Sequence, residues 1–304
     1  MNFGRNVTRR DFLAQSSSLA FVGAMMGTRS SATLASSAPW KKAACIGVLP
    51  DGLSVLQKFQ LAKTAGFEGI EPNTLNSAKD VQECKEAAES TGVRIHSIMN
   101  SDHWKFPLTD NDPEVVRKCI EGIKTSMHNA HDLGADTVLL VPGIVTPEVG
   151  YADVYQRSQE RIRELIPLAE ELKVIIAVEN VGNRFLQSPL EFARYVDEFK
   201  SPWVRAYFDI GNVVSIGYPP DWIRILGKRL VKVHIKRFEP GTNQPKFDPK
   251  DRRTQGVDWA AVYKALTDVG YAGWLSAEVR SGDEAYVREV SRRLDSFFSG
   301  QDPS

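Results

Sequence analysis

The chain has 304 residues, of which 42% are hydrophobic and 25% are charged, a composition typical of a globular protein with a sizeable core. Lysine plus arginine and aspartate plus glutamate number 38 each, so the formal net charge is zero. That balance gives no electrostatic footprint for nucleic acid or an acidic membrane surface. The three cysteines are widely separated and argue against a disulfide scaffold.

The N-terminal 38 residues predict an export signal. Residues 8–14, Thr-Arg-Arg-Asp-Phe-Leu-Ala, resemble a twin-arginine signal, and an apolar segment at 19–26 and a Ser/Ala-rich tail follow in signal-peptide order. The alternative is an amphipathic or disordered N-terminus. The apolar segment is shorter than the roughly 20 residues of a membrane-spanning helix, so we expect no stable membrane anchor. We therefore expect an exported, periplasmic protein that uses the twin-arginine export machinery.

From residue 41 onward, helical patterns alternate with apolar, strand-like runs. Gly66, Gly92, Gly134 and Gly270 each follow a helical pattern and precede an apolar run, a position at which glycine accepts the left-handed conformation that ends a helix. The strand-like runs are residues 44–49, 67–71, 93–99, 137–141, 174–179, 204–209, 230–234 and 274–278. Eight strands alternating with about eight helices predict a single (β/α)₈ TIM barrel over residues 41–300.

A doubly wound open sheet is the alternative architecture, because strand–helix alternation by itself fits both folds. Two observations favour the barrel. No Gly-x-Gly-x-x-Gly motif follows the first strand, and polar residues gather at the ends of many strands instead of at one crevice.

Four of the later apolar runs end on or next to a potential metal ligand, at Glu179, Asp209, His234 and Glu278. In a parallel barrel the carboxyl ends of all strands lie on one face, so these side chains would converge. Three carboxylates and one imidazole suit Mn²⁺, Mg²⁺ or Co²⁺ better than a structural Zn²⁺ site with sulfur ligands. The alternative is that they are separate polar caps at strand ends.

Several motifs in this half of the chain resemble those of a known family. They are Ile-Ala-Val-Glu-Asn-Val-Gly-Asn-Arg-Phe-Leu at 176–186, Tyr-Phe-Asp-Ile-Gly-Asn at 207–212, Val-His-Ile-Lys at 233–236 and Ser-Ala-Glu at 276–278. In combination they are similar to the xylose-isomerase-like TIM-barrel superfamily, and within it to the sugar and sugar-phosphate isomerase/epimerase branch. The resemblance covers about residues 43 to 298.

The resemblance implies a metal-dependent isomerase or epimerase that acts on carbohydrates. Glu179, Asp209, His234 and Glu278 match the family's four metal ligands, and Glu179 and Glu278 also match its catalytic acid/base pair. Such a site stabilises an enediolate while carboxylates on opposite sides of a sugar carbon remove and return a proton. One-sided transfer would instead give an aldose–ketose isomerase. The expected cofactor is Mn²⁺, with Mg²⁺, Co²⁺ or Zn²⁺ as alternatives.

Five further residues are candidates for substrate binding. Asn212 stands where ketose epimerases carry a substrate-contacting His. Lys236, two residues after His234, shares its face of the strand and could hold a hydroxyl or a phosphate, or be a surface lysine. His103 and Trp104 could form a sugar-stacking wall or simply pack a loop. Glu71 ends the second strand.

We therefore predict a free sugar, keto-sugar or sugar derivative as the substrate, because export argues against a phosphorylated one. Elimination or hydrolysis of a keto-glycoside on the same site, and a non-catalytic sugar-binding barrel, are the alternatives. The superfamily's apurinic endonuclease would need more histidines than the five present, and the neutral charge disfavours nucleic acid. A homodimer is left open.

Overall fold

The structure is a computed structural model that describes residues 39–243, 246–248, 250 and 256–303. The expected export signal at 1–38 lies outside these residues and remains a prediction. In chain order the elements are β1 Lys41–Cys45, η1 Ile46–Val48, α1 Val55–Ala65, β2 Gly69–Glu71, α2 Ala78–Thr91, β3 Arg94–Ile95, β4 Ile98–Met99, α3 Pro113–Asp132, β5 Thr137–Leu140, α4 Tyr151–Leu172, β6 Ile175–Glu179, α5 Pro189–Asp197, β7 Val204–Asp209, α6 Ile210–Val213, α7 Pro219–Leu226, η2 Gly227–Arg229, β8 Leu230–Ile235, α8 Trp259–Asp268, β9 Trp274–Ala277 and α9 Glu284–Phe298.

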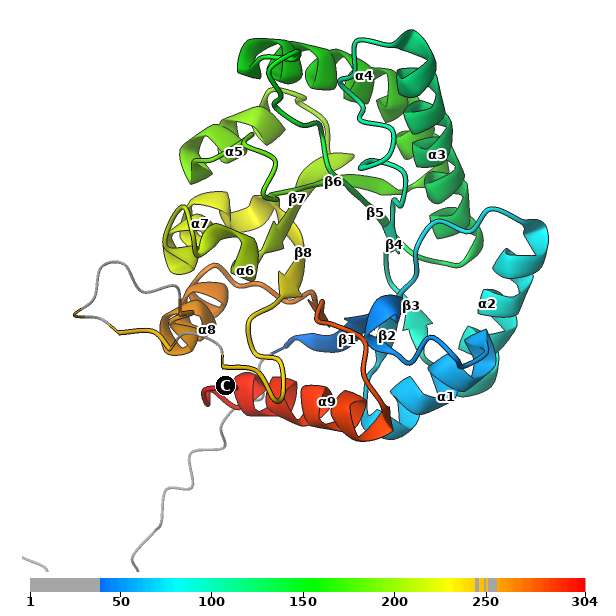
Figure 1. Cartoon of the computed structure of the whole chain (residues 1–304), viewed down its shortest axis with the longest axis vertical. Coiled ribbons are helices and arrows are strands. Elements are labelled where there is room, and N and C mark those ends of the chain that lie inside the picture. The colour runs from blue at the N-terminus through cyan, green and yellow to red at the C-terminus, as the bar shows by residue number, and fades with distance from the viewer. Residues whose placement is uncertain (1–38, 244–245, 249, 251–255, 304) are drawn as a thin grey trace, which may run out of the picture. The chain divides into compact units, whose positions relative to one another are not determined.

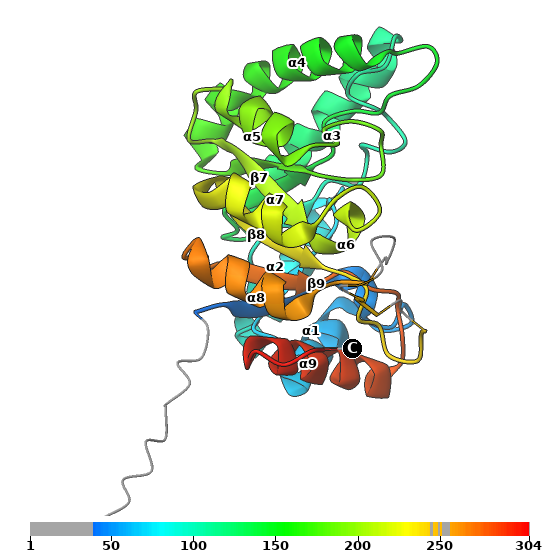
Figure 2. The ribbon, with the colours of Figure 1, turned by 90° about the vertical axis from the view of Figure 1, so that its left-hand side faces the viewer.

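Within the described residues, nine strands form one parallel sheet in the order β3-β2-β1-β9-β8-β7-β6-β5-β4. The strands form a ring with the longer helices on its outside (Figure 1), and the side view shows β7 and β8 running in the same direction (Figure 2). Strands that follow one another in the chain are neighbours in the sheet, except β3 and β4, which lie at the two ends of this order. The fold is therefore a single, nearly closed α/β TIM barrel, and the doubly wound alternative is wrong.

The predicted third strand, residues 93–99, is interrupted. Its first part, β3, pairs with β2, and its second part, β4, pairs with β5, so the two ends of the sheet are neighbours in the chain. The ladder breaks at His96, whose ring stacks on Trp274 of β9 with 4.7 Å between ring centroids. An isolated parallel bridge between Asn73 and Met99 joins the segment after β2 to β4. This interruption explains why nine strands are present where eight were predicted.

The glycines at the helix ends adopt the predicted left-handed conformation. The φ angles of Gly66, Gly92, Gly134 and Gly270 are 92°, 72°, 71° and 68°. A side chain with a Cβ is disfavoured in this region, so glycine lets the chain leave each helix and turn directly into the next strand. These joints set the short helix-to-strand connections that a barrel requires.

Side chains alternate between two environments along the barrel strands. Leu139, Ala177 and Tyr207, from β5, β6 and β7, form a small buried cluster of their own. The intervening residues, such as Val178 and Phe208, belong to the main core between the strands and the helices. The alternation follows the two-residue period of a strand, so every second residue faces the interior of the ring.

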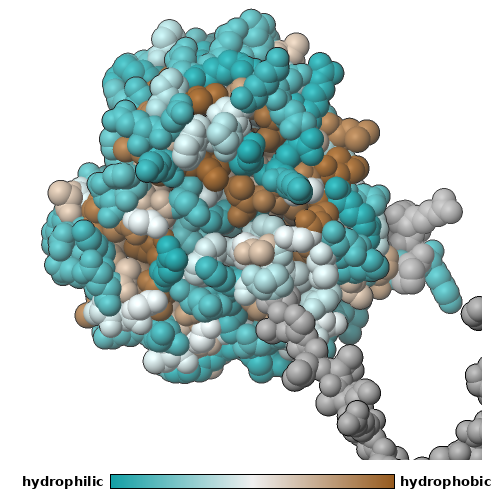
Figure 3. Space-filling view, turned by 180° about the vertical axis from the view of Figure 1, so that it is seen from behind, coloured by the Kyte–Doolittle hydropathy of each residue, from teal (hydrophilic) through white to brown (hydrophobic). Residues whose placement is uncertain are grey.

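Helices and loops cover the outside of the barrel. Figure 3, seen from behind, shows a largely hydrophilic surface in which apolar residues gather in patches. The exposed large apolar residues are Leu56, Trp104, Leu190, Ile216 and Tyr218. None of the helices in the described part of the chain combines the length and apolar character needed to cross a membrane.

The close contact between β2 and β9 leads to a prediction for Gly69. A Cβ placed there would lie 2.6 Å from Cζ3 of Trp274 and 3.1 Å from Cδ2 of His96, whose two rings are stacked. We expect Gly69→Ala to lower the free energy of unfolding by about 1–3 kcal/mol through overpacking, measured by urea denaturation. Gly52→Ala is the control, because a Cβ at Gly52 meets no heavy atom within 4 Å. Equal midpoints for the two variants would contradict the prediction.

Candidate metal centre at the barrel mouth

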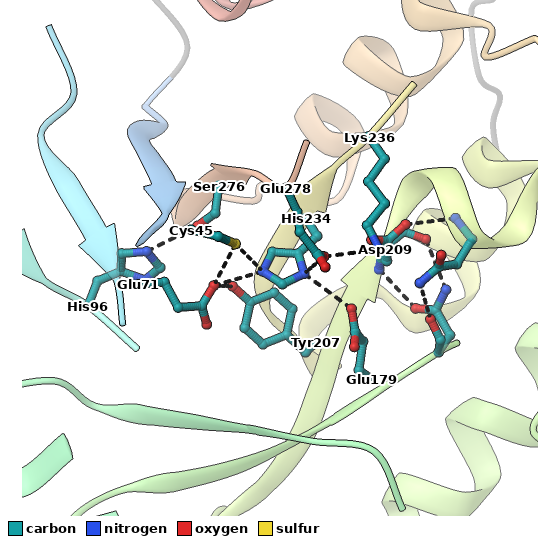
Figure 4. A network of polar contacts seen from close by, with 12 residues as sticks. Cys45, Glu71, His96, Glu179, Tyr207, Asp209, His234, Lys236, Ser276 and Glu278 are labelled. Carbon is teal, nitrogen blue, oxygen red and sulfur yellow. Dashed lines mark hydrogen bonds and ion pairs between the residues drawn. The ribbon is translucent and has the colours of Figure 1, made fainter. Parts of the chain in front are cut away.

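The structure brings together the four residues predicted as metal ligands. Glu179 and Asp209 end β6 and β7, His234 is the fifth residue of β8, and Glu278 directly follows β9. Glu179 and Asp209 each lie two residues after a position that faces the interior, Ala177 and Tyr207, so strand alternation turns these two side chains inward. One ligand atom from each lies within 4.8 Å of all the others (Figure 4).

His234 lies at the centre of this cluster and is fully buried. Its Nδ1 atom is 2.6 Å from Glu278 Oε2 and 3.1 Å from Glu179 Oε1. Its Nε2 atom points the opposite way and lies 2.7 Å from Glu71 Oε2. Burial opposes protonation of His234, but the surrounding negative groups outweigh it and raise its pKa well above the ordinary value. The ring therefore bridges carboxylates on its two sides.

Lys236 supplies a second positive charge. Strand alternation places it on the face of His234, and its Nζ atom lies 3.1 Å from Asp209 Oδ2 and 3.1 Å from Glu278 Oε2. Burial would lower the pKa of Lys236, but the two carboxylates more than compensate and raise it. A Cβ at Gly211 would lie 2.6 Å from the Cβ of Lys236, so glycine is needed where the chain passes this residue. Lys236 is thus part of the cluster and not a freely solvated side chain.

Two asparagines hold Asp209 in place. The side chain of Asn180 accepts a hydrogen bond from the Asp209 backbone N–H at 2.9 Å and donates one to its carbonyl at 2.9 Å. Asn212 donates its backbone N–H to Asp209 Oδ1 at 2.7 Å and its side-chain amide to the Asn180 carbonyl at 3.0 Å. The ends of β6 and β7 are therefore tied together. The visible contacts of Asn212 are with protein groups, and its predicted substrate contact remains a prediction.

Glu71 lies on the far side of the His234 ring from Glu179 and Asp209 (Figure 4). It is 0% exposed, and Oε2 accepts a hydrogen bond from the Tyr207 hydroxyl at 2.9 Å in addition to its contact with His234. The Sγ atom of Cys45 is 3.5 Å from both Glu71 Oε2 and His234 Nε2. Burial raises the pKa of the Cys45 thiol, which therefore stays neutral. This position behind the ring does not favour the predicted contact between Glu71 and substrate.

His103 and Trp104 lie in the segment that follows β4, on the same side of the barrel as the cluster. Their rings meet edge to face with 5.4 Å between centroids. Trp104 is 51% exposed, whereas His103 is buried and its Nδ1 has no hydrogen-bond partner among the described residues. Burial lowers the pKa of His103 to about 4, so its imidazole is neutral at pH 7. An exposed indole beside a neutral imidazole remains our candidate for a sugar-binding wall.

Three residues of this network were not predicted from the sequence. Asn180 directly follows Glu179, Tyr207 lies two residues before Asp209, and Cys45 ends the first strand. Counting two residues back from Asp209 along the strand could have found Tyr207. Asn180 and Cys45 are not related to a predicted ligand by this alternation, and their contacts depend on the tertiary structure.

The two glutamates predicted as the acid/base pair have different electrostatic surroundings. Burial and the neighbouring carboxylates outweigh the attraction of His234 and raise the pKa of Glu179 to about 7. Burial also acts on Glu278, but the attraction of His234 and Lys236 exceeds it and lowers its pKa to about 2. Titratable groups whose pKa values are pushed apart in one site are typical of a general acid and a general base.

The residues present fit a divalent cation. Glu71, Glu179, Asp209 and Glu278 are four carboxylates that face two cationic side chains, so the ionised cluster carries excess negative charge. Asp209 Oδ2 and Glu278 Oε2 are buried and accept no well-formed hydrogen bond; their contacts are ionic. Buried carboxylate oxygens without hydrogen bonds are costly unless a cation or a proton neutralises them. Oxygen donors with one imidazole suit Mn²⁺ or Mg²⁺ and also accept Zn²⁺.

The pKa values of Glu179 and Glu278 shift in opposite directions. Replacing each glutamate by glutamine should therefore change the stability of the metal-free protein in opposite directions. The raised pKa of Glu179 gives stability that is fully present below pH 4.5 and is lost as the pH rises through about 7. The lowered pKa of Glu278 gives stability that is present above pH 4.5 and is lost as the pH falls through about 2. At pH 8 we therefore expect Glu179→Gln to raise the free energy of unfolding and Glu278→Gln to lower it, each by about 1–3 kcal/mol.

Urea denaturation at pH 5 and pH 8 in the presence of a chelator measures both effects. The stability gained by Glu179→Gln over the wild type should be smaller at pH 5, because Glu179 of the folded wild type is then largely protonated and its buried charge no longer lowers the free energy of unfolding as much. Two variants that change stability in the same direction at pH 8 would contradict the assignment of opposite environments.

Comparisons with known proteins agree with this fold. Residues 59–297 match the family model described as Xylose isomerase-like TIM barrel. L-ribulose-5-phosphate 3-epimerase UlaE of Escherichia coli K12 is 26% identical over 259 residues, which cover 81% of this chain and 90% of the relative. The structure of an L-ribulose 3-epimerase matches with a TM-score of 0.70 at 18% identity, over 86% of this chain and 94% of that one.

A third match is the IOLI protein with a bound zinc atom, with a TM-score of 0.67 at 16% identity over 85% of this chain and 98% of that one. At such identities the structural matches show the fold alone. The named epimerases are isomerases that act on carbohydrates, as expected for relatives of this chain. Because the family model matches well over half of the sequence, the chain belongs to the Xylose isomerase-like TIM barrel family.

Proposed function

We propose that this protein is a divalent-metal-dependent sugar epimerase that transfers a proton through an enediolate. The observation that carries the proposal is the cluster of Glu179, Asp209, His234 and Glu278, the first three of them buried, whose ligand atoms lie within 4.8 Å of one another at the barrel mouth. The epimerase relatives support the reaction class. The metal is proposed from the donor set, and Mn²⁺ is our first choice with Mg²⁺, Co²⁺ and Zn²⁺ as alternatives.

The residues of the cluster have different roles in the proposed reaction. Glu179, Asp209, His234 and Glu278 would hold the cation, which when bound supplies a Lewis acid for the sugar's carbonyl and hydroxyl oxygens. Glu278, kept ionised by His234 and Lys236, is the base that removes the proton from the carbon next to the carbonyl. Glu179, which approaches the same ring nitrogen from β6, is the acid that returns the proton. Transfer from two different sides inverts the carbon.

Lys236 and the barrel wall orient the substrate in this proposal. The Lys236 ammonium lies beside Asp209 and Glu278, where it stabilises negative charge on the enediolate. Trp104 presents an exposed indole to the apolar face of a sugar ring, and His103 offers a free Nδ1 to a hydroxyl. Burial of Glu179, Asp209 and His234 keeps bulk water from the reacting atoms.

We propose an unphosphorylated ketose or keto-sugar derivative as the substrate. The two named epimerase relatives differ on this point, because one title names a 5-phosphate and the other a free sugar. The twin-arginine-like sequence at residues 8–14 supports an exported, periplasmic enzyme, and phosphosugars are intermediates of the cytoplasm. The proposed location rests on the sequence alone, since residues 1–38 lie outside the described part of the chain.

The proposed metal site predicts that added Mn²⁺ stabilises the protein. We expect protein stripped with a chelator to gain about 2.7 kcal/mol of stability at a Mn²⁺ concentration 100 times the dissociation constant. For a domain of this size that corresponds to a rise in melting temperature of about 5–10 °C, measured by calorimetry. Asp209→Asn is the informative variant, because it removes one charge from the cluster with little change in shape and should reduce the rise. If Mn²⁺ left the melting temperature of the wild-type protein unchanged, the metal proposal would be contradicted.

Isotope exchange tests the reaction itself. In D₂O with saturating Mn²⁺, we expect deuterium to enter at the carbon next to the carbonyl of a free ketose or keto-glycoside, with conversion to the epimer, followed by NMR. We expect Glu179→Gln and Glu278→Gln to lower the rate by at least about 10²-fold. Glu89→Gln, an exposed change on α2, is the control and should keep full activity.

The same spectra separate the alternatives. Cleavage of a glycosidic bond would support elimination or hydrolysis in place of epimerisation. No exchange and no turnover of any sugar by fully metal-loaded protein would leave a sugar-binding barrel and would refute the epimerase.

A further inference from the structure

Glu71 is a buried carboxylate that the proposed chemistry does not use. It ends β2, is 0% exposed, and lies on the opposite side of His234 from the proposed ligands (Figure 4). Sequence reasoning placed it against substrate, yet its Oε2 atom is already engaged by two protein groups. A buried charge in such a position requires a structural explanation.

The geometry connects Glu71 to the orientation of one ring. Its Oε2 atom lies 2.7 Å from His234 Nε2, while the other ring nitrogen, Nδ1, faces Glu278 and Glu179 at 2.6 Å and 3.1 Å. The Tyr207 hydroxyl donates to the same Oε2 atom at 2.9 Å and fixes the carboxylate from a third side. The neutral Cys45 thiol fills the remaining space, 3.5 Å from both Oε2 and Nε2.

We propose that Glu71 is a positioning residue that accepts the Nε2–H of His234 and thereby directs the Nδ1 lone pair toward Glu179, Asp209 and Glu278. This inference rests on the proposed metal-dependent function and deepens it. A neutral imidazole carries its proton on either nitrogen, and only the Nε2–H form leaves Nδ1 free to ligate. A carboxylate hydrogen-bonded to the non-ligating nitrogen selects that form and makes the ligand more basic.

The tautomer can be measured in protein that keeps Glu71. In uniformly ¹⁵N-labelled protein loaded with Zn²⁺, long-range ¹H–¹⁵N correlation spectra distinguish a protonated from a ligating ring nitrogen. The chain has only five histidines, so a comparison with a His234→Gln sample assigns the His234 signals. We expect a protonated Nε2 and a metal-bound Nδ1. The reverse pattern would overturn the inference whether or not the Glu71 variants fold.

Substitution tests the effect on affinity. We expect Glu71→Gln to weaken Mn²⁺ binding by about 10–100-fold, measured by the electron paramagnetic resonance signal of free Mn²⁺. Glu71→Asp retains the charge and should recover part of the lost affinity. Tyr207→Phe removes the second hydrogen bond to the same oxygen but leaves the carboxylate, so we expect a smaller loss. Wild-type affinity in Glu71→Gln would refute the positioning role.

Enzyme kinetics distinguish a positioning role of Glu71 from a direct contact between Glu71 and the substrate. If Glu71 acts only through His234, saturating Mn²⁺ should restore KM in Glu71→Gln to the wild-type value. If Glu71 touches substrate, KM should stay raised at every Mn²⁺ concentration, and this result would overturn the proposal. The binding and NMR measurements need no substrate, so a protein that binds metal with the expected tautomer but turns over no sugar would refute the proposed epimerase and leave this inference intact.

Discussion

The arrangement of this site depends on one electrostatic constraint: several carboxylates are buried around a single imidazole. Glu71 and Glu278 contact opposite nitrogens of His234, and Glu179 contacts the ring from β6, two strands away. Each buried carboxylate carries a large desolvation cost, which a neighbouring positive charge or a proton must offset. In the metal-free protein His234 and Lys236 supply the positive charge. The remaining excess of negative charge matches what a divalent cation would neutralise.

The same constraint explains the polar groups around the cluster. Asn180 and Asn212 satisfy the backbone at the end of β7 and hold the Asp209 carboxylate by its backbone and one oxygen, which leaves the other oxygen directed at Lys236. Tyr207 donates a hydrogen bond to Glu71 Oε2 from inside the barrel. A partly satisfied buried network is less stable than an apolar core of the same volume. The cost at this site is consistent with selection for chemistry instead of stability.

The barrel converts a one-dimensional pattern into this three-dimensional site. Strand alternation separates Val178 and Phe208, which pack against the helices, from Ala177 and Tyr207, which face the interior. Parallel strands then bring their carboxyl ends to one rim, so ligands far apart in sequence meet. The interrupted strand at His96 shows where this regularity fails, because contacts with β9 across the interior are not encoded in the local sequence.

Much of this was determined by local sequence alone. The alternation of strands and helices, the left-handed glycines at helix ends and the identity of the four clustered residues follow from periodicity, backbone sterics and the special ends of apolar runs, which are short-range properties. Tertiary structure decided what depends on distance. It placed Glu71 against Nε2 of His234, brought Cys45 and Tyr207 next to it, and moved the pKa values of Glu179 and Glu278 apart, because burial and charge–charge energies exist only once remote strands have come together.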